Sequence, residues 1–246
     1  MTATLLLTRP QQAAQDFAQV VTAAGWTGPV MVAPLMQIVP CALDPRAREG
    51  AGTLVFTSHH GVGAWLAAGG GVTLPVWCVG PRTAQAAHEA GFSHIAQAPG
   101  GDAVSLRAAL LAARPVPPVL HLRGTYAAMA LAEELTLAGL PAREMVAYDQ
   151  QACALPDKAR DLLSRPGPVV VPLFSPRSAR LFAAELEKLP NPVAQLHVVA
   201  ISRPCAAALD GGKCSTLRTV DHPDGGAMRN AVLQVQAELE DNEKPR

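Results

Sequence analysis

The sequence predicts an α/β protein with parallel sheets, built from two related halves. Short apolar segments alternate with Ala-rich helical patterns along almost the whole chain, which is typical of parallel strands connected by helices. Similar motifs recur in the same order at a spacing of roughly 114–124 residues. A length of 246 residues with 49% hydrophobic side chains is sufficient for two separate cores.

Nine short segments have the apolar character of strands that are buried on both faces. They are Thr4–Thr8, Val30–Ala33, Thr53–Thr57, Val76–Val79, His94–Ala96, Val119–Leu122, Val169–Leu173, His197–Ile201 and Thr216–Val220. Nine segments between them are rich in the helix formers Ala, Leu, Glu, Gln and Arg. They are Pro10–Ala24, Gly61–Ala68, Arg82–Ala90, Ala103–Ala113, Tyr126–Ala138, Asp157–Ser164, Ser178–Leu189, Pro204–Leu209 and Ala227–Glu240.

Four motifs of the first half have counterparts in the second half. The pairs are Leu6–Pro10 with His121–Gly124, Leu54–Ser58 with Pro172–Pro176, Cys78–Ala84 with Ala200–Ala206, and Pro99–Ala103 with Pro223–Ala227. One such match would mean little, but four in the same order indicate an ancestral duplication. Two stretches do not follow the strand–helix alternation, Leu35–Pro40 and Glu144–Ala152, and we interpret them as extended connectors between two lobes.

The composition excludes several classes of function. Equal numbers of basic and acidic side chains, 20 of each, argue against a nucleic-acid or membrane-surface partner. The sequence contains no signal peptide and no apolar run long enough to span a bilayer, so we expect a cytoplasmic protein. The five cysteines show no C-x-x-C spacing and are expected to be reduced thiols.

Signatures of cofactors and metals are missing from the sequence. It has no G-x-G-x-x-G after the first strand, no phosphate-binding P-loop and no G-x-S-x-G nucleophile elbow. His59 and His60 are adjacent, without a third ligand at metal-binding spacing. We therefore expect neither a cofactor nor a metal ion.

The turns after the strands are the candidate binding positions, because parallel strands end at the edge of the sheet where ligands bind. Six of them read Thr8-Arg9-Pro10, Thr57-Ser58-His59, Gly80-Pro81-Arg82-Thr83, Arg123-Gly124-Thr125, Ser175-Pro176-Arg177-Ser178 and Ser202-Arg203-Pro204. Ser and Thr are ordinary helix caps, but arginine in or beside five of the six turns is not explained by capping. Arginine binds carboxylates and phosphates, so these turns predict a site for an anionic small molecule.

The chain has only two tyrosines. Tyr126 lies at the start of a predicted helix, which favours packing or a contact at the rim of a site. Tyr148 lies in the second connector, Glu144–Ala152, away from either predicted core, where a phenol could act as a proton donor.

Taken together, these motifs resemble the uroporphyrinogen-III synthase family, the cyclising enzymes of tetrapyrrole biosynthesis. The resemblance runs along nearly the whole chain in order. It rests on Leu7–Pro10, Val55–Val62, Val79–Ala84, Leu122–Gly124, Val146–Asp149, Phe174–Ala179, Ala200–Ser202 and Pro223–Gly225. No single motif is diagnostic, whereas the ordered set is fairly specific.

The resemblance implies two flavodoxin-like lobes that are joined by a two-stranded β linker. In that family the first strand–helix unit belongs to the lobe that contains the C-terminal half. Residues 1–35 and 155–246 would then form one lobe, residues 41–145 the other, and residues 36–40 and 146–154 the linker strands. A monomer is expected.

The resemblance also implies a reaction, the cofactor-free cyclisation of the linear tetrapyrrole hydroxymethylbilane to uroporphyrinogen III. Water is lost and ring D is inverted, which makes the enzyme a hydro-lyase. Tyr148 matches the connector tyrosine of the family, which is suspected to protonate the leaving hydroxyl, and Thr83 and Ser175 match positions near the ligand. The expected contacts to the substrate carboxylates are Thr8, Arg9, Thr57, Ser58, Gly80, Arg82, Thr83, Arg123, Gly124, Ser175, Arg177, Ser178 and Ser202.

One turn departs from the family pattern. Ser202–Ala206 stands where many members have Gly-Pro-x-Thr-Ala, so Cys205 replaces a threonine on the ligand side. A hydroxyl contact from that position is therefore in doubt, although Ser202 could cap the helix instead.

Two other functions remain open on the sequence alone. A non-catalytic two-lobed binding or sensor protein for a small polyanion would use the same turns without needing the phenol. A nucleotide-dependent enzyme on flavodoxin-like lobes is disfavoured by the missing phosphate-binding loops.

Overall fold

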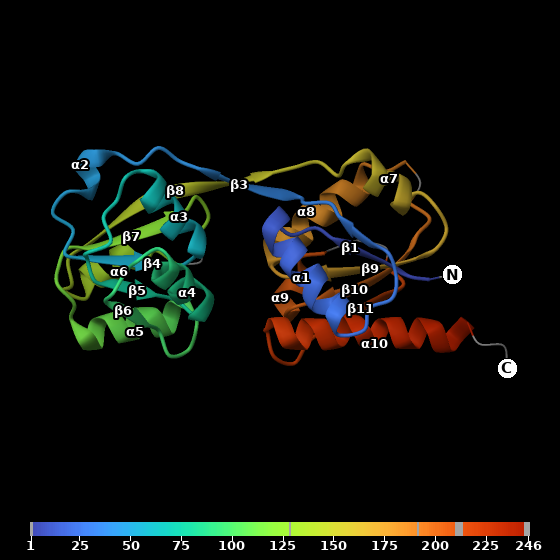
Figure 1. The fold of residues 1–246 in the computed structure, drawn as a ribbon. Coiled ribbons are helices and arrows are strands. Elements are labelled where there is room, and N and C mark those ends of the chain that lie inside the picture. The colour runs from blue at the N-terminus through green and yellow to red at the C-terminus, as the bar shows by residue number, and fades with distance from the viewer. Residues whose placement is uncertain (1, 128, 191, 210–213, 244–246) are drawn as a thin grey trace. The chain divides into compact units, whose positions relative to one another are not determined.

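The computed structural model describes residues 2–127, 129–190, 192–209 and 214–243, and its chain divides into two compact units (Figure 1). Unit 1 comprises Met1–Gln37 together with Gln151–Arg246, and unit 2 comprises Ile38–Gln150. Each unit is an α/β domain with its own sheet, so the predicted fold class is confirmed.

Unit 1 contains a parallel five-stranded sheet in the order β11-β10-β9-β1-β2. Its strands are β1 (Thr4–Leu7), β2 (Val30–Val32), β9 (Pro168–Leu173), β10 (Gln195–Ala200) and β11 (Thr216–Thr219). Its helices are α1 (Gln11–Ala23), α7 (Asp157–Leu163), α8 (Pro176–Glu187), α9 (Arg203–Ala207) and α10 (Gly225–Glu243). Within the unit this is the flavodoxin-type strand order, and β1 and α1 belong to it with the C-terminal half.

Unit 2 contains a six-stranded sheet in the order β3-β8-β7-β4-β5-β6. Its strands are β3 (Met36–Pro40), β4 (Thr53–Phe56), β5 (Val76–Cys78), β6 (Ile95–Gln97), β7 (Val119–Gly124) and β8 (Ala142–Ala152). Its helices are α2 (Pro45–Arg48), α3 (His59–Ala67), α4 (Pro81–Glu89), α5 (Ala103–Ala113) and α6 (Leu131–Leu137). The strands from β8 to β6 are parallel.

The two sheets repeat the same arrangement, as the recurring motifs predict. Strands β9, β10, β11, β1 and β2 hold the same relative places in unit 1 as β4, β5, β6, β7 and β8 in unit 2. In each unit the helices cover both faces of the sheet (Figure 1). Helices α8 and α9 pack on one face of unit 1 as α3 and α4 do in unit 2, and α1 and α10 cover the other face as α5 and α6 do.

The chain passes between the units along β3 and β8, which are neighbours at the edge of the six-stranded sheet. The Cys41 amide donates to the Ala147 carbonyl (3.0 Å), and the Cys153 amide donates to the Leu35 carbonyl (2.9 Å). Strand β8 does more than connect the units, because residues 142–148 pair in parallel with β7. Its first part is therefore a strand of the unit 2 sheet.

Helix α6 differs from the expected Tyr126–Ala138. It begins at Leu131, so Tyr126 lies in the preceding loop, and Arg123 and Gly124 belong to β7 rather than to a turn. The cause is the hydrogen bonding of this stretch: the Thr125 amide donates to the Tyr148 carbonyl, and the Arg123 guanidinium donates to the carbonyls of Gly124 and Thr125. These bonds hold residues 123–125 beside β8, in the extended course of β7. The short helix α2 was not predicted.

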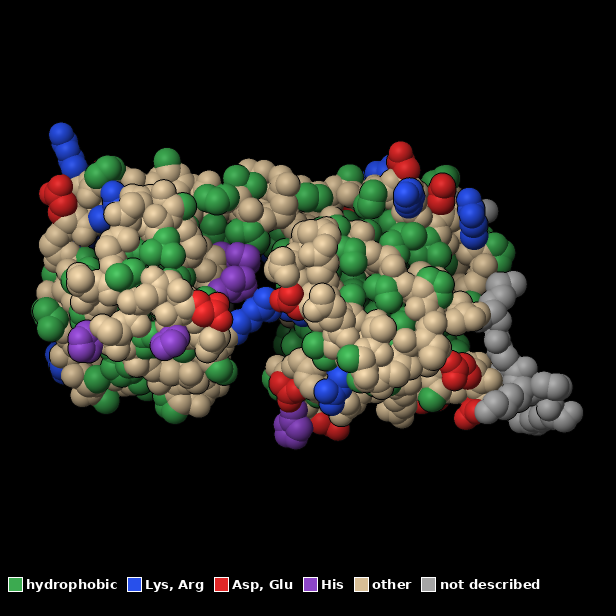
Figure 2. Space-filling model, in the orientation of Figure 1, with side chains coloured by type: hydrophobic (Ala, Val, Ile, Leu, Met, Phe, Trp, Pro, Cys, Tyr) green, Lys and Arg blue, Asp and Glu red, His purple; other side chains and the backbone are tan. Residues whose placement is uncertain are grey.

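Among the described residues, no helix combines the length and the hydropathy that a bilayer span requires. On the face drawn in Figure 2, Lys and Arg side chains are scattered among Asp and Glu side chains. This surface agrees with the equal numbers of basic and acidic residues.

Glu185 gives a test of the packing in unit 1. It is only 5% exposed on α8, accepts a hydrogen bond from the Leu155 amide (2.8 Å) and pairs with Lys188. We expect Glu185→Ala to lower the free energy of unfolding by about 2 kcal/mol, because the buried Leu155 amide loses its acceptor. Urea unfolding measures the loss, and Glu187→Ala, an exposed position of the same helix, should stay within about 0.5 kcal/mol of wild type.

Candidate active site

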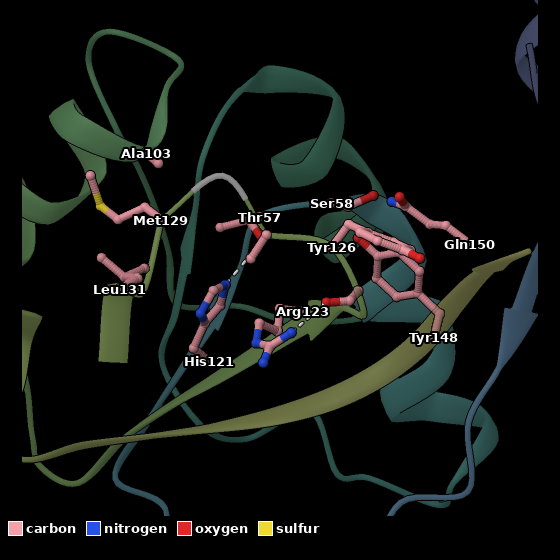
Figure 3. A pocket seen from close by; sticks show the side chains of 12 residues that line it. Thr57, Ser58, Ala103, His121, Arg123, Tyr126, Met129, Leu131, Tyr148 and Gln150 are labelled. Atoms are coloured by element: carbon pink, nitrogen blue, oxygen red, sulfur yellow. Dashed lines mark hydrogen bonds between the residues drawn. The ribbon is translucent and has the colours of Figure 1, made fainter. Parts of the chain in front are cut away.

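A cavity of about 270 Å³ lies in unit 2, at the carboxyl ends of β4 and β7 and beside β8 (Figure 3). Its walls are formed by Thr57, Ser58, Ala103, His121, Arg123, Gly124, Tyr126, Ala127, Met129, Leu131, Tyr148 and Gln150. Ser58, Tyr126, Tyr148 and Gln150 gather at one end, whereas Ala103, Met129 and Leu131 lie at the other. The cavity therefore has a polar end and an apolar end.

Tyr148 reaches this cavity because of an irregularity in the sheet. Arg123 of β7 pairs with Val146 of β8, but the next residue, Gly124, pairs with Tyr148, so β8 contains one extra residue. Such a bulge redirects the following side chains. Ala147 and Tyr148 consequently belong to the same hydrophobic cluster, although a regular strand would turn them to opposite faces of the sheet.

The burial of Tyr148 corrects the expectation that it lies away from either core. The side chain is 5% exposed and belongs to the hydrophobic cluster of unit 2. Burial raises the pKa of the phenol, while hydrogen bonds with the Ser58 side chain and the Gly124 backbone act in the opposite direction. The phenol is therefore protonated at neutral pH.

Two histidines lie next to Tyr148. The rings of His60 and Tyr148 are 5.5 Å apart between centroids, and those of His59 and His60 are 3.9 Å apart. Burial, together with the nearby His59 and Arg82, lowers the pKa of His60 to about 4. His60 is therefore neutral at physiological pH. The positive charge near it, which disfavours protonation of His60, would favour a bound anion.

Arg123 lines the cavity, but its guanidinium is bound to other groups of unit 2. Nη2 lies 2.6 Å from Glu144 Oε1, and Nη1 donates to the carbonyls of Gly124 (2.8 Å) and Thr125 (3.1 Å). The hydrogen bond to Glu144 raises the pKa of Arg123 and lowers that of Glu144. This geometry favours a structural role over the predicted contact with a substrate carboxylate.

Beneath Thr57 lies a histidine in the middle of β7. Thr57 Oγ1 is 3.0 Å from His121 Nε2, and His121 is 2% exposed. Burial lowers the pKa of His121 to about 4; Glu144 acts against this shift, and Arg123 adds to it. The imidazole is neutral at physiological pH.

The other predicted residues of unit 2 lie at the starts of two helices. Ser58 is the N-cap of α3, where its hydroxyl accepts from the His60 amide (3.3 Å). Gly80 is the N-cap of α4, Arg82 is exposed in the first turn, and Thr83 is buried. These three residues of α4 do not line the cavity described above.

In unit 1 the predicted residues follow β1, β9 and β10. Ser175 caps α8 in a reciprocal capping box with Ser178, and Ser202 caps α9 by accepting from the Cys205 amide. The Arg9 guanidinium lies 3.8 Å from the centroid of the Phe174 ring. Thr8 is buried, and Arg177 is half-buried in the first turn of α8.

Cys205 lies in the interior of unit 1. Its side chain is buried, and the thiol donates to the Leu173 carbonyl (3.4 Å). Burial also raises the pKa of this thiol.

Comparison with known proteins identifies the family. The sequence profile of the family described as uroporphyrinogen-III synthase HemD matches residues 15–229, most of the chain. The chain belongs to the uroporphyrinogen-III synthase HemD family. Membership implies an enzyme of tetrapyrrole synthesis with a small-molecule tetrapyrrole substrate.

Solved structures of uroporphyrinogen-III synthases share the fold. The crystal structure of the Helicobacter pylori 26695 protein is 17% identical, with a TM-score of 0.64, over 96% of this chain and 100% of that one. A mutant of the protein from the extremely thermophilic bacterium Thermus thermophilus is 15% identical, with a TM-score of 0.51, over 95% and 99% of the two chains. No curated protein sequence matches the chain significantly.

Three polar side chains of the cavity in this uroporphyrinogen-III synthase family member were not among the predicted site residues, although Tyr126 was interpreted as a packing residue or a contact at the rim of a site. They are His121, Gln150 and Tyr126, the last of which is 56% exposed in its loop. A polar residue inside the apolar run Val119–Leu122 was the available signal for His121. Gln150 carried no such signal, because its position depends on the bulge in β8. Tyr126 lines the cavity from the loop before α6, in keeping with the rim contact that was one of its two interpretations.

His121 makes stability depend on pH in a defined direction. Its pKa is about 4 in the folded protein and about 6.5 in an unfolded chain, so the unfolded state binds more protons between these values. The contribution to stability is complete above pH 6.5 and is lost as the pH falls toward 4. We expect wild type to lose about 3 kcal/mol more than His121→Gln between pH 7 and pH 4. Parallel pH profiles of urea unfolding for the two proteins would contradict this prediction.

Proposed function

We propose that this chain is a uroporphyrinogen-III synthase that converts hydroxymethylbilane to uroporphyrinogen III. The reaction is a cofactor-free cyclisation in which water is lost and ring D is inverted. It belongs to the hydro-lyase class and to the biosynthesis of tetrapyrroles such as haem.

The observation that carries this proposal is the buried phenol at the polar end of the unit 2 cavity. Tyr148 is protonated at neutral pH, because burial raises the pKa of its phenol, and its ring and hydroxyl lie against Gly124. A neutral, positioned phenol is suited to protonate a leaving hydroxyl group. A protein that only binds a polyanion would have no need for such a group.

The proposed sequence of steps begins with Tyr148 donating its proton to the terminal hydroxyl of hydroxymethylbilane, which departs as water. The substituted carbon of ring D attacks the resulting azafulvene carbon of ring A and forms a spiro intermediate. That intermediate breaks and recloses with ring D inverted. The proton that is released when the pyrrole regains aromaticity returns to the Tyr148 phenolate, so protons balance over the cycle.

Holding a flexible chain in a folded conformation is the main task of such an enzyme. The cavity is slightly smaller than the roughly 300–1,000 Å³ of complete small-molecule sites, so it would hold part of the tetrapyrrole. We propose that Thr57, Ser58 and the first amides of α3 bind a carboxylate there, since helix N-termini favour anions. Further carboxylates are assigned to the other predicted turn residues, namely Thr8, Arg9, Gly80, Arg82, Thr83, Ser175, Arg177, Ser178 and Ser202.

The test is a coupled assay in which purified protein receives freshly made hydroxymethylbilane. Chromatography of the oxidised products separates the type III isomer from the type I isomer that forms spontaneously. We expect type III to predominate. A product that remains entirely type I would refute the proposal, and saturable tetrapyrrole binding without turnover would support the binding-protein alternative.

A further inference from the structure

We infer that His121 is a positioning residue, which orients the Thr57 hydroxyl as a hydrogen-bond donor to a ligand carboxylate in the unit 2 cavity. The inference rests on the proposed function for the identity of the ligand. It concerns a residue that contacts no substrate itself and acts through Thr57.

The position of His121 is unusual for a polar side chain. It lies inside β7, between β4 and β8, with Val119, Leu120 and Leu122 as buried neighbours on the same strand. Nε2 is 3.0 Å from Thr57 Oγ1. Nδ1 is buried and has no hydrogen-bond partner among the described residues.

These contacts decide which ring nitrogen of the neutral imidazole carries the hydrogen. If Nδ1 carried it, a buried N–H donor would have no acceptor, which is rare and costly in folded proteins. If Nε2 carries it, only a lone pair on Nδ1 is unused, and Nε2–H donates to Thr57 Oγ1. The geometry therefore favours the Nε2–H tautomer.

The direction of that hydrogen bond determines what Thr57 can do. Its oxygen accepts from His121, so its own hydrogen remains available for another acceptor. Thr57 lines the cavity, and among the described residues the structure shows His121 as the only hydrogen-bond partner of its hydroxyl. The hydroxyl is thus a donor that faces an acceptor brought by a ligand.

The cavity indicates which kind of ligand group would supply this acceptor. Met129 and Leu131 form apolar walls, and Thr57 and Ser58 contribute hydroxyls (Figure 3). A pyrrole ring that bears a carboxylate side chain has both of these features. The charged groups near His121 are Glu144 and Arg123, which pair with each other, so the imidazole stays neutral while its partner binds an anion.

Nitrogen NMR of histidine-labelled protein tests the orientation independently of activity. We expect His121 to show the Nε2–H tautomer and to remain neutral from pH 8 to pH 5. Comparison with His121→Gln identifies its signals among the seven histidines. A signal from the Nδ1–H tautomer would overturn the inference.

A double-mutant cycle tests the role in binding. The probe is a monopyrrole that bears one acetate and one propionate, and its Kd is measured by calorimetry alongside the KM for hydroxymethylbilane. We expect His121→Leu to raise both constants roughly fivefold, Thr57→Val to raise them equally, and the double variant to show no further increase. His121→Gln can still donate to Thr57 and should restore most of the affinity.

The outcomes separate this inference from the proposed function. If wild type forms the type III isomer but folded His121→Leu keeps the wild-type Kd and KM, the inference fails alone. It also fails if His121→Leu weakens binding as strongly in the Thr57→Val variant as in wild type, because the effect would then not act through the Thr57 hydroxyl. If wild type yields only type I isomer while the monopyrrole shows the expected cycle, the proposed function fails alone.

Discussion

Tyr148→Phe is expected to lower kcat for formation of the type III isomer by roughly 10²-fold, the smaller end of the usual effect of a general acid. The phenylalanine ring keeps the contacts that Tyr148 makes in the hydrophobic cluster of unit 2, so the fold should persist. What is lost is the hydroxyl, the proposed proton donor, whose pKa burial raises. Because the substrate carboxylates are held by other groups, KM should change far less than kcat.

The second tyrosine of the chain offers a matched comparison. Tyr126 lines the same cavity but is 56% exposed, whereas Tyr148 is 5% exposed. Tyr126→Phe removes an identical hydroxyl and should lower kcat by less than about tenfold. Initial rates of the coupled assay, with separation of isomers, measure both variants. Wild-type turnover in Tyr148→Phe would remove this phenol from the mechanism, and a larger loss in Tyr126→Phe would transfer the role of donor to Tyr126.

The features that the sequence predicted well are local ones. Ser58, Ser175 and Ser202 follow strands and precede helices, and each caps its helix in the structure. A cap is formed by a side chain and an amide two or three residues away, so the local sequence is sufficient to predict it. The repeated motifs likewise predicted two sheets of matching order, because the same pattern of strands and helices packs in the same way.

The site depends on contacts between residues that are distant in sequence, and there the prediction was incomplete. Alternation along Glu144–Ala152 indicated an extended connector with Tyr148 away from either core, whereas pairing with β7 and one extra residue in β8 bury Tyr148. Arg123 was interpreted as a substrate contact because nothing in its own turn reveals Glu144, 21 residues away on the next strand. Neither strand pairing nor a bulge can be predicted from the sequence of one strand alone, because both depend on the partner strand.

Gly124→Ala is expected to reduce type III synthesis more than about tenfold and to cost about 1–3 kcal/mol of stability. A β-carbon on Gly124 would lie 2.5 Å from Cε2 and 2.8 Å from Cζ of Tyr148, and 3.1 Å from its hydroxyl oxygen. Real β-carbons do not approach ring carbons so closely, so the phenol must move. The backbone conformation of Gly124 is not left-handed, and the effect is therefore one of space rather than of backbone strain.

The proposed cause can be separated from simple destabilisation. If Gly124→Ala acts by displacing the phenol, then adding it to Tyr148→Phe should lower activity little below that of Tyr148→Phe alone. The double variant should still be less stable than Tyr148→Phe, because the added β-carbon meets the phenylalanine ring in the same way. Gly63→Ala is the matched control, since a β-carbon at that exposed helical position meets nothing within 4 Å. If instead the double variant loses as much activity as the two single variants combined, Gly124→Ala acts independently of the Tyr148 hydroxyl. The proposed positioning of that hydroxyl by Gly124 would then be wrong.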